Sequence, residues 1–301
     1  MANPIVTSLP NYIEERRLPL IAEAVLGAKS ARLFTLQSDI KHSAALNLLS
    51  TNVEFGDGMS CGWDEAGEAT LTQRILTVGN MKVNMAFCDK ALLDKWAGYQ
   101  VRVAAGRETM PFEEDFVNQV IKNIQETIEI ALYQGDTASS TPNLAYFDGL
   151  IKILTDATGT IDVTASSGTA YEKVMQIYTS IPEKAFSRGD VAILVGMDVF
   201  RTFTAELIEK NLYHYNVGTP DGEIILPGTN VRVIGVNGLN ATNKAIAASL
   251  RNIFYGTDMM NDEEVFDFWY SRDNREFRLA IYFNAGTQVA FPDEVVLAAL
   301  A

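Results

Sequence analysis

The sequence predicts an α+β fold, and three patterns support this prediction. Residues 112–134 repeat apolar side chains with the period of a long amphipathic helix, residues 265–291 have the aromatic pattern of strands, and residues 171–236 alternate helix and strand. With 301 residues the chain can bury one large core or two modest ones. Its 48% hydrophobic and 21% charged residues are ordinary globular values, which argue against disorder and against a membrane protein.

The N-terminal region, residues 11–32, predicts a terminal arm with one short helix. The polar group EERR is followed by a short apolar segment that Pro19 interrupts. Because terminal segments stay mobile unless something holds them, we expect a neighbouring subunit to anchor this arm.

A long hairpin with an open tip is predicted over residues 51–87. Met81, Val83, Met85 and Phe87 alternate with less apolar residues, and the stretch GDGMSCGWDEAGEAT is rich in Gly and acidic residues. An isolated hairpin is only marginally stable in water, so we expect it to lie on another surface. An ordinary mobile surface loop explains this feature equally well.

Two helices are expected next. Asp89 is suited to cap a short helix over KALLDKWAG, and Pro111 suits the first turn of a longer one. Gly135 stops the second helix, which spans about 35 Å. Its apolar stripe consists of Phe116, Val117, Val120, Ile121, Ile124, Ile128 and Leu132.

The second half of the chain predicts an α/β block and then a sheet. A Ser-, Thr- and Gly-rich stretch that ends near Thr169 marks a domain junction. The expected elements are a helix at 171–186, a strand at 191–195, a helix at 198–211, an irregular loop at 213–229 and a strand at 231–236. An antiparallel sheet should follow from strands at 265–270, 276–283 and 288–291.

No pattern predicts catalysis or a cofactor. His42 and His214 lie far apart in unlike contexts, and no HExxH, GxSxG, P-loop or GxGxxG motif is present. Cys61 and Cys88 have no metal-ligand spacing and are interpreted as reduced thiols. The start lacks the apolar core of a secretory signal, so the cytoplasm is the default location.

The charge balance limits nucleic-acid binding. Asp and Glu total 38 against 24 Lys and Arg, a net charge of −14. This charge repels the phosphate backbone and argues against tight, extensive binding. A container that encloses DNA without gripping it remains compatible.

Several segments, in their order and spacing, resemble the major capsid proteins of tailed bacteriophages, which have the Hong Kong ninety-seven type fold. The resemblance covers nearly the whole chain. It is carried by YQGD at 133–136, FDGL at 147–150, AILVGMDVFRTFTAEL at 192–207, LPGTNVRVIGV at 226–236 and FDFWYSRDNREFRLAIYFNAGTQVAFPDEVV at 266–296.

The resemblance implies a division of the chain into the parts of that fold. These are an N-terminal arm at 1–45, an E-loop hairpin at 46–88, a P-domain with its spine helix at 89–150, an A-domain at 151–260, a return sheet of the P-domain at 261–291, and a C-terminal segment toward the A-domain at 292–301.

The resemblance also implies a function. Copies of the chain should assemble into hexamers and pentamers of an icosahedral shell around double-stranded DNA, in a virion that forms in the cytoplasm of a host bacterium. The hairpin should lie across the next subunit's spine helix and sheet, with Met59, Trp63 and Leu71 as contacts between subunits.

Implied partners are scaffold, portal and decoration proteins, with no sequence-specific DNA binding and no membrane. Because no long scaffolding segment precedes the arm, a separate scaffold or a cleaved precursor is implied. No residue matches a crosslinking motif.

Two alternatives stay open. An encapsulin-type nanocompartment shell has the same fold but encloses cargo proteins, which electron microscopy of purified particles would distinguish from DNA. A soluble α/β enzyme is suggested by the strand at 191–195 that enters a helix after GMD, and a chain that stays monomeric at high concentration would favour it.

Overall fold

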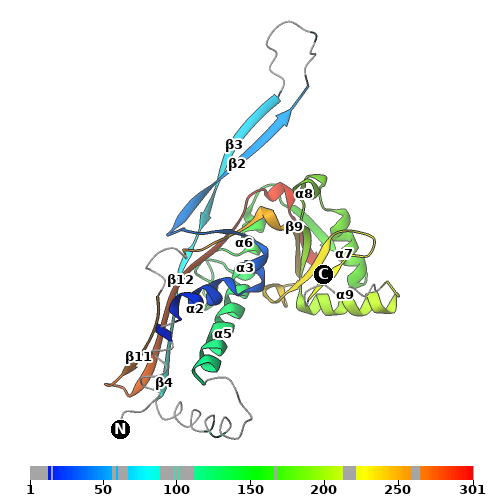
Figure 1. The fold of residues 1–301 in the computed structure, drawn as a ribbon. Coiled ribbons are helices and arrows are strands. Elements are labelled where there is room, and N and C mark those ends of the chain that lie inside the picture. The colour runs from blue at the N-terminus through cyan, green and yellow to red at the C-terminus, as the bar shows by residue number, and fades with distance from the viewer. Residues whose placement is uncertain are drawn as a thin grey trace.

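The computed structural model describes residues 13–14, 16–55, 59, 67–88, 98, 101, 112–165, 168–212, 222–258 and 265–300. Most of the expected KALLDKWAG helix and of the irregular loop at 213–229 lies outside these residues. The described strands form a five-stranded sheet, a six-stranded sheet and a two-stranded hairpin that projects from the body of the molecule (Figure 1). No helix in the described ranges is long and apolar enough to cross a bilayer.

The arm folds onto the chain's own core. It forms α2 (Arg17–Leu26), α3 (Lys29–Leu33) and β1 (Thr35–Gln37), so two helices stand where one was expected. Leu20, Ala24 and Val25 are buried in the same apolar cluster as the long helix. These residues recur at helical spacing and make an apolar stripe that the long helix covers. The expectation that a neighbouring subunit anchors the arm is therefore wrong for residues 17–37.

The hairpin is present, and it is shorter than expected. Strands β2 (Ser43–Val53) and β3 (Gly67–Thr77) pair in antiparallel register. The next strand, β4 (Gly79–Cys88), pairs with the C-terminal strand β12 (Glu276–Val289) instead. Including residues 79–88 in the hairpin was therefore wrong. Their alternating apolar side chains pack on the core beneath the sheet, which explains the period of two.

The long helix is confirmed as α5 (Phe112–Gln134). Val117, Ile121, Ile128 and Leu132 of its apolar stripe are at most 2% exposed. The helix ends at Gly135, where a Cβ atom would lie 2.4 Å from the carbonyl oxygen of Phe147. Backbone hydrogen bonds join this end to the FDGL segment, including Gly149 N–H to Gly135 O at 2.8 Å.

The five-stranded sheet packs against α5. In it β1 runs parallel to β10 (Ile253–Gly256), and β10 and β11 (Val265–Ser271) both pair antiparallel with β12, whose other edge holds β4. The antiparallel tail sheet is confirmed. The last expected strand, at 288–291, is not a separate strand, because residues 288–289 are the end of β12. Strand β12 is long enough to join the hairpin side of the molecule to the far end of the sheet (Figure 1).

The six-stranded sheet has the order β5-β13-β9-β6-β8-β7. Its strands are β5 (Ile161–Ala165), β6 (Val191–Gly196), β7 (Glu223–Ile225), β8 (Arg232–Val236), β9 (Lys244–Ser249) and β13 (Val296–Leu300). Strand β6 is buried throughout, because one face of the sheet packs toward α5 and the other on helices α7 (Ala170–Thr179), α8 (Glu183–Arg188) and α9 (Met197–Glu209). The C-terminal strand β13 joins this sheet, in the direction expected for residues 292–301.

Several short elements depart from the expected pattern. The helix at 171–186 is divided into α7 and α8 at Pro182, which cannot donate a backbone hydrogen bond. Helix α6 (Leu150–Asp156) and strands β5, β7, β9 and β10 were not predicted. Strand β9, KAIAAS, is rich in Ala and has only one β-branched residue, so its local strand signal is weak. The described part of the chain also contains three 3-10 turns, at Asn237–Leu239 (η1), Leu250–Asn252 (η2) and Pro292–Glu294 (η3).

Candidate assembly surfaces

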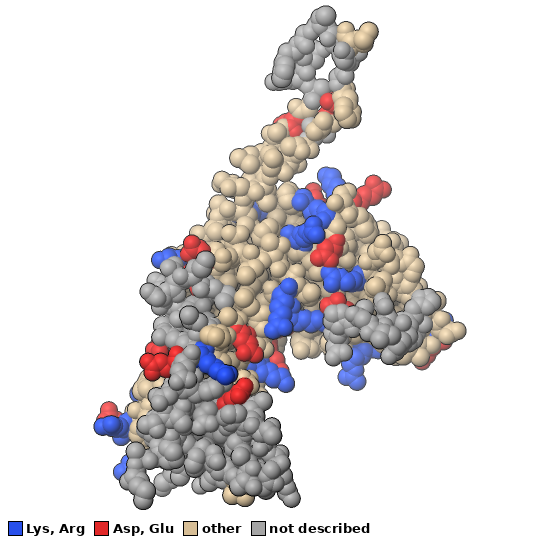
Figure 2. Space-filling model, viewed as in Figure 1, with Lys and Arg blue, Asp and Glu red and all other residues tan. Residues whose placement is uncertain are grey.

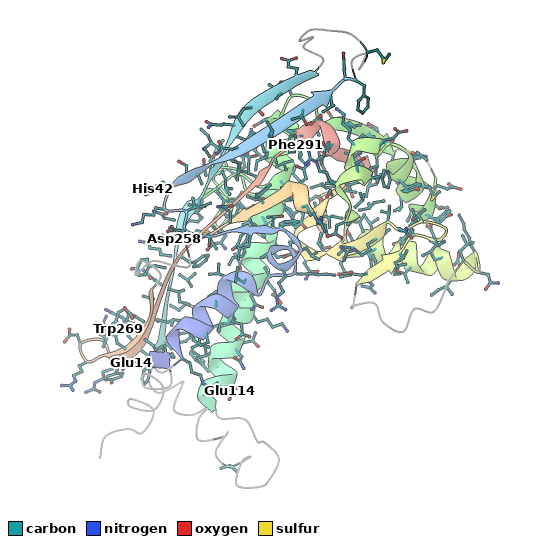
Figure 3. All side chains as sticks on the ribbon, turned by 45° about the horizontal axis from the view of Figure 1, so that its top comes forward. Glu14, His42, Glu114, Asp258, Trp269 and Phe291 are labelled. Atoms are coloured by element: carbon teal, nitrogen blue, oxygen red, sulfur yellow. The ribbon has the colours of Figure 1, made fainter. Side chains whose placement is uncertain are left out.

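The histidines, cysteines and acidic residues of the described ranges form no metal site. No group of three or more His, Cys, Asp or Glu side chains gathers there to hold a metal ion. His42 is exposed at the base of the hairpin (Figure 3), and His214 lies outside the described ranges. Cys88 is a free, exposed thiol, and Cys61 is outside those ranges as well.

The hairpin presents one exposed face without any charged residue. Side chains of odd-numbered residues share this face, because directly opposed pairs such as Leu49 and Leu71 both have odd numbers. We call it the uncharged face. It consists of Ser43, Ala45, Asn47, Leu49, Thr51 and Val53 on β2, and Gly67, Ala69, Leu71, Gln73, Ile75 and Thr77 on β3. In the view of Figure 2 the stem of the hairpin shows almost no acidic or basic side chain.

Four aliphatic side chains on the uncharged face lie in water. Leu49 is 62% exposed, Val53 70%, Leu71 67% and Ile75 62%. Scattered exposed aliphatic residues are ordinary on protein surfaces, but a contiguous apolar patch is typical of an interaction site. One polar pair on this face is hydrogen-bonded across the strands, Gln73 Nε2 to Asn47 Oδ1 at 2.8 Å.

The opposite face fixes the base of the hairpin to the body. Leu46, Leu48 and Leu76 are buried in a small cluster with Ile40 and Val78. The side-chain amide of Gln288 on β12 donates to the carbonyl oxygen of Ile75, at 2.7 Å. The hairpin is therefore held firmly at one end, and its uncharged face points away from the core.

The three contacts expected from the sequence differ in what the structure shows. Leu71 lies on the uncharged face, directly opposite Leu49. Met59, in the segment between β2 and β3, is 91% exposed, and Phe55, which follows β2, is 98% exposed. Trp63 lies outside the described residues. Contacts at Leu49, Val53 and Ile75 were not predicted from the sequence, although the odd numbering of these residues is a period-two signal that could have indicated them.

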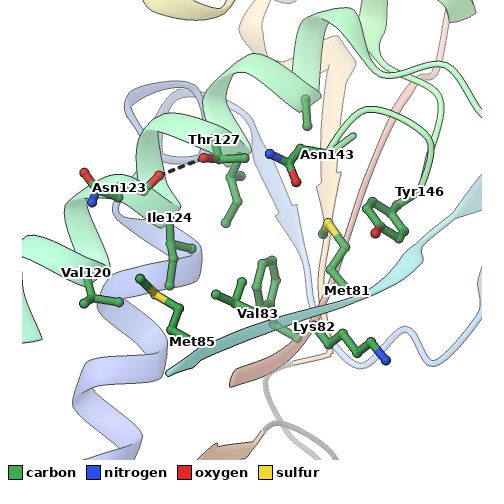
Figure 4. A pocket seen from close by; sticks show the side chains of 13 residues that line it. Met81, Lys82, Val83, Met85, Val120, Asn123, Ile124, Thr127, Asn143 and Tyr146 are labelled. Atoms are coloured by element: carbon green, nitrogen blue, oxygen red, sulfur yellow. Dashed lines mark hydrogen bonds between the residues drawn. The ribbon is translucent and has the colours of Figure 1, made fainter. Parts of the chain in front are cut away.

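A second candidate surface is an apolar groove between α5 and β4, with a cavity of about 200 Å³. Met81, Val83 and Met85 of β4 face Val120 and Ile124 of α5 across it (Figure 4). Asn143 and Tyr146 border one side, and among the described residues Lys82 is the only charged one that lines it. A groove of this kind can take an apolar side chain from a partner.

A buried polar cluster joins the arm to α5. Glu129 is 4% exposed, and its two carboxylate oxygens accept from Ser30, from the backbone N–H at 2.9 Å and from the hydroxyl at 2.6 Å. The Ser30 and Tyr133 hydroxyls lie 2.6 Å apart. Burial raises the pKa of Glu129, although the two Ser30 hydrogen bonds and the charge of Lys29 oppose this effect. Burial and the nearby Glu129 carboxylate also raise the pKa of Tyr133, so this hydroxyl stays protonated.

Sequence comparisons identify no relatives for this chain. No family model matches it. No curated protein matches it either.

Solved structures do match. A chain of the satellite phage P4 procapsid including the size determination (Sid) protein has a TM-score of 0.64 at 12% identity, over 100% of this chain and 98% of that one. A chain of Gordonia phage Cozz has a TM-score of 0.59 at 11% identity, over 90% and 86%. The virus-like particle from Pyrococcus furiosus has a TM-score of 0.54 at 9% identity, over 94% and 97%. The chain therefore has the α+β fold of Hong Kong ninety-seven type phage capsids.

Proposed function

We propose that this chain is the major capsid protein of a tailed bacteriophage, whose copies form the hexamers and pentamers of an icosahedral shell around double-stranded DNA. The observation that carries the proposal is the uncharged face of the hairpin. It exposes Leu49, Val53, Leu71 and Ile75 on a stem that is fixed to the body, so the chain itself does not cover them. The fold shared with a phage procapsid chain supports the same function.

In this assembly the hairpin of one copy lies across α5 and β4 of the next. The apolar groove on that surface, lined by Met81, Met85 and Ile124, suits side chains such as Leu71. Burying a Leu or Ile completely is worth about 1.5–3 kcal/mol, so covering the exposed two thirds or so of each aliphatic side chain contributes about 1–2 kcal/mol. Such contacts are individually weak, but a closed symmetric shell repeats them around every copy.

Met59, Trp63 and Leu71 are our proposed contacts between subunits, and the structure adds Leu49, Val53 and Ile75 as candidates. The capsid parts follow the division given above, with the E-loop restricted to the hairpin that ends at Thr77. Strand β4 then belongs to the P-domain, together with α5 and β12.

The remaining features of the proposal concern partners and location. The shell would form in the cytoplasm of a host bacterium with scaffold, portal and decoration proteins, and it would end in the virion. The net charge of −14 fits a wall that encloses DNA without sequence-specific binding. The chain would have no catalytic role and no cofactor.

Negative-stain imaging of the expressed chain tests the proposal, with rings, sheets or closed shells as the expected result. A chain that remains monomeric at high concentration would refute assembly and favour an α/β enzyme.

A second candidate is a shell that encloses cargo proteins, because the virus-like particle from Pyrococcus furiosus shares the fold. Particles isolated from their natural host distinguish the two: nuclease-protected double-stranded DNA supports the phage capsid, and a stoichiometric cargo protein supports the compartment.

A further inference from the structure

Helix α3 lies where three parts of the molecule meet. Its residue Ser30 binds α5, donating from its backbone N–H and its hydroxyl to the two oxygens of Glu129. The preceding residue, Lys29, points to the six-stranded sheet, and its ammonium group donates to the carbonyl oxygens of Gly235 at 3.0 Å and Gly222 at 3.3 Å. Two adjacent residues of the arm therefore hold α5 on one side and the six-stranded sheet on the other.

Two backbone carbonyl groups of the sheet lie close together and accept hydrogen bonds from Lys29. Gly222 precedes β7 and Gly235 lies within β8, and the Gly235 N–H donates to the Gly222 carbonyl at 2.9 Å. A Cβ atom on Gly222 would lie 2.9 Å from Lys29 Nζ, and the φ of +78° at this position disfavours any other residue. The site thus consists of two backbone carbonyls that the long cationic side chain of Lys29 reaches.

Direct contact between α5 and the sheet is concentrated at the C-terminal end of the helix. There Gln134 Nε2 donates to the carbonyl oxygen of Gly238 at 2.7 Å, and a Cβ atom on Gly238 would lie 2.2 Å from the ring of Tyr133. The same Cβ atom would lie 2.3 Å from the carbonyl oxygen of Glu129, so the direct contact reaches this residue, and the Lys29–Ser30 pair adds a second link through α3 beside it. A second attachment point restricts rotation about the first.

The attachment of α3 is also of a kind that can be released. The helix has five residues and no side-chain cap at its N-terminus, so it is not stable alone. Its anchors are a carboxylate, an ammonium group and a hydroxyl, which water solvates well once they separate. Release uncovers Ser30 and Ala31, which are at most 4% exposed, so the single chain favours the bound position.

We propose that α3 is a releasable clamp, in which Lys29 and Ser30 together fix the orientation of the six-stranded sheet relative to α5. When α3 leaves, both the arm and the β7–β8 end of the sheet gain freedom. If the chain forms a shell as proposed above, the position of the arm then controls the angle between the two sheets and hence the curvature that a subunit can adopt. That consequence alone rests on the proposed function.

Hydrogen exchange measured by mass spectrometry on the purified full chain tests the clamp, with all variants compared in the same oligomeric state. Lys29→Met removes the cation, and Ser30→Ala removes the hydroxyl. Hydrogen bonds to charged groups are strong enough that we expect exchange in residues 24–33 to accelerate about tenfold or more. The clamp predicts an accompanying acceleration in residues 222–236, which lie far from Ser30 in sequence.

Matched controls separate the clamp from general loosening. Lys184→Met removes an exposed ammonium group on α8, away from α3, and should leave both regions unchanged. Lys29→Arg keeps a cationic donor and should retain more protection than Lys29→Met. If Lys29→Met fails to fold, Ser30→Ala, which removes a single hydroxyl, decides the test. Faster exchange in the arm with unchanged exchange at 222–236 would overturn the clamp, and so would unchanged exchange in the arm. Neither result affects the shell proposal, because this measurement requires no assembly.

Discussion

Replacing Leu49 and Leu71 together, as L49T/L71T, tests the uncharged face of the hairpin most directly. The two side chains lie directly opposite each other across β2 and β3, and they are 62% and 67% exposed in the single chain. Threonine has the β-branched shape that strands favour, so the hairpin itself should persist. The change therefore removes apolar surface from the proposed interface while leaving the fold intact.

The expected loss of assembly free energy follows from the apolar surface that the interface would bury. Complete burial of a Leu is worth about 1.5–3 kcal/mol, and roughly two thirds of each side chain remains to be covered, which gives about 1–2 kcal/mol for each. Since Thr retains a methyl group, the pair should lose about 2 kcal/mol per subunit in assembly. That loss raises the concentration at which shells form about thirtyfold. The free energy of unfolding of the unassembled chain should change by less than about 0.5 kcal/mol, as for other exposed sites.

Light scattering across a concentration series measures the assembly threshold, and denaturant unfolding of the unassembled chain measures stability. T70S/T72S on the opposite face is the matched control, because these residues are exposed on the same strand and flank Leu71. Shells that form at the same concentration as in the unmodified protein would show that assembly does not bury this face. A large loss of stability in the unassembled chain would show instead that the two leucines support the fold.

Three further predictions concern stability. Glu129→Gln should remove a pH dependence of the free energy of unfolding. Because burial raises the pKa of Glu129, the native chain binds the carboxyl proton more tightly than the unfolded chain does. The free energy of unfolding of the unmodified chain should therefore fall as pH rises from the ordinary carboxyl pKa through the raised one. Denaturant unfolding of both proteins between about pH 4 and pH 8 checks this, since a constant difference would contradict the raised pKa. Arg188→Met should lower the free energy of unfolding by about 3 kcal/mol, because it leaves the buried Glu294 carboxylate without its guanidinium partner. The double variant R188M/E294M should lose less stability in the same denaturant unfolding. Equal losses in the two variants would refute the pairing. Gly238→Ala should lower stability by about 1–3 kcal/mol, because the added methyl group meets the Tyr133 ring, and an unchanged melting temperature would show that α5 can move away from the sheet.

Sequence alone determined those elements whose signal is local. The stripe from Phe116 to Leu132 has the helical period and ends at a glycine, so α5 was predicted with its bounds. Strand β6 was indicated by a continuous apolar run, and β11 and β12 by aromatic residues around a turn. The order of these segments was sufficient to indicate the capsid fold. Short strands such as β9 escaped prediction, because an Ala-rich segment becomes a strand only between partners that are distant in sequence.

Only the tertiary structure shows which part of the molecule each segment packs against. The alternation of Met81, Val83, Met85 and Phe87 is the same for a free hairpin and for a sheet strand, and only the pairing of β4 with β12 distinguishes them. The sequence of the arm is equally compatible with a position on another subunit. The burial of Val25 and the hydrogen bonds between Ser30 and Glu129 show that the arm lies on α5 of its own chain. Periodicity specifies which face of an element is apolar, whereas the surface that covers this face depends on contacts between residues about a hundred or more positions apart.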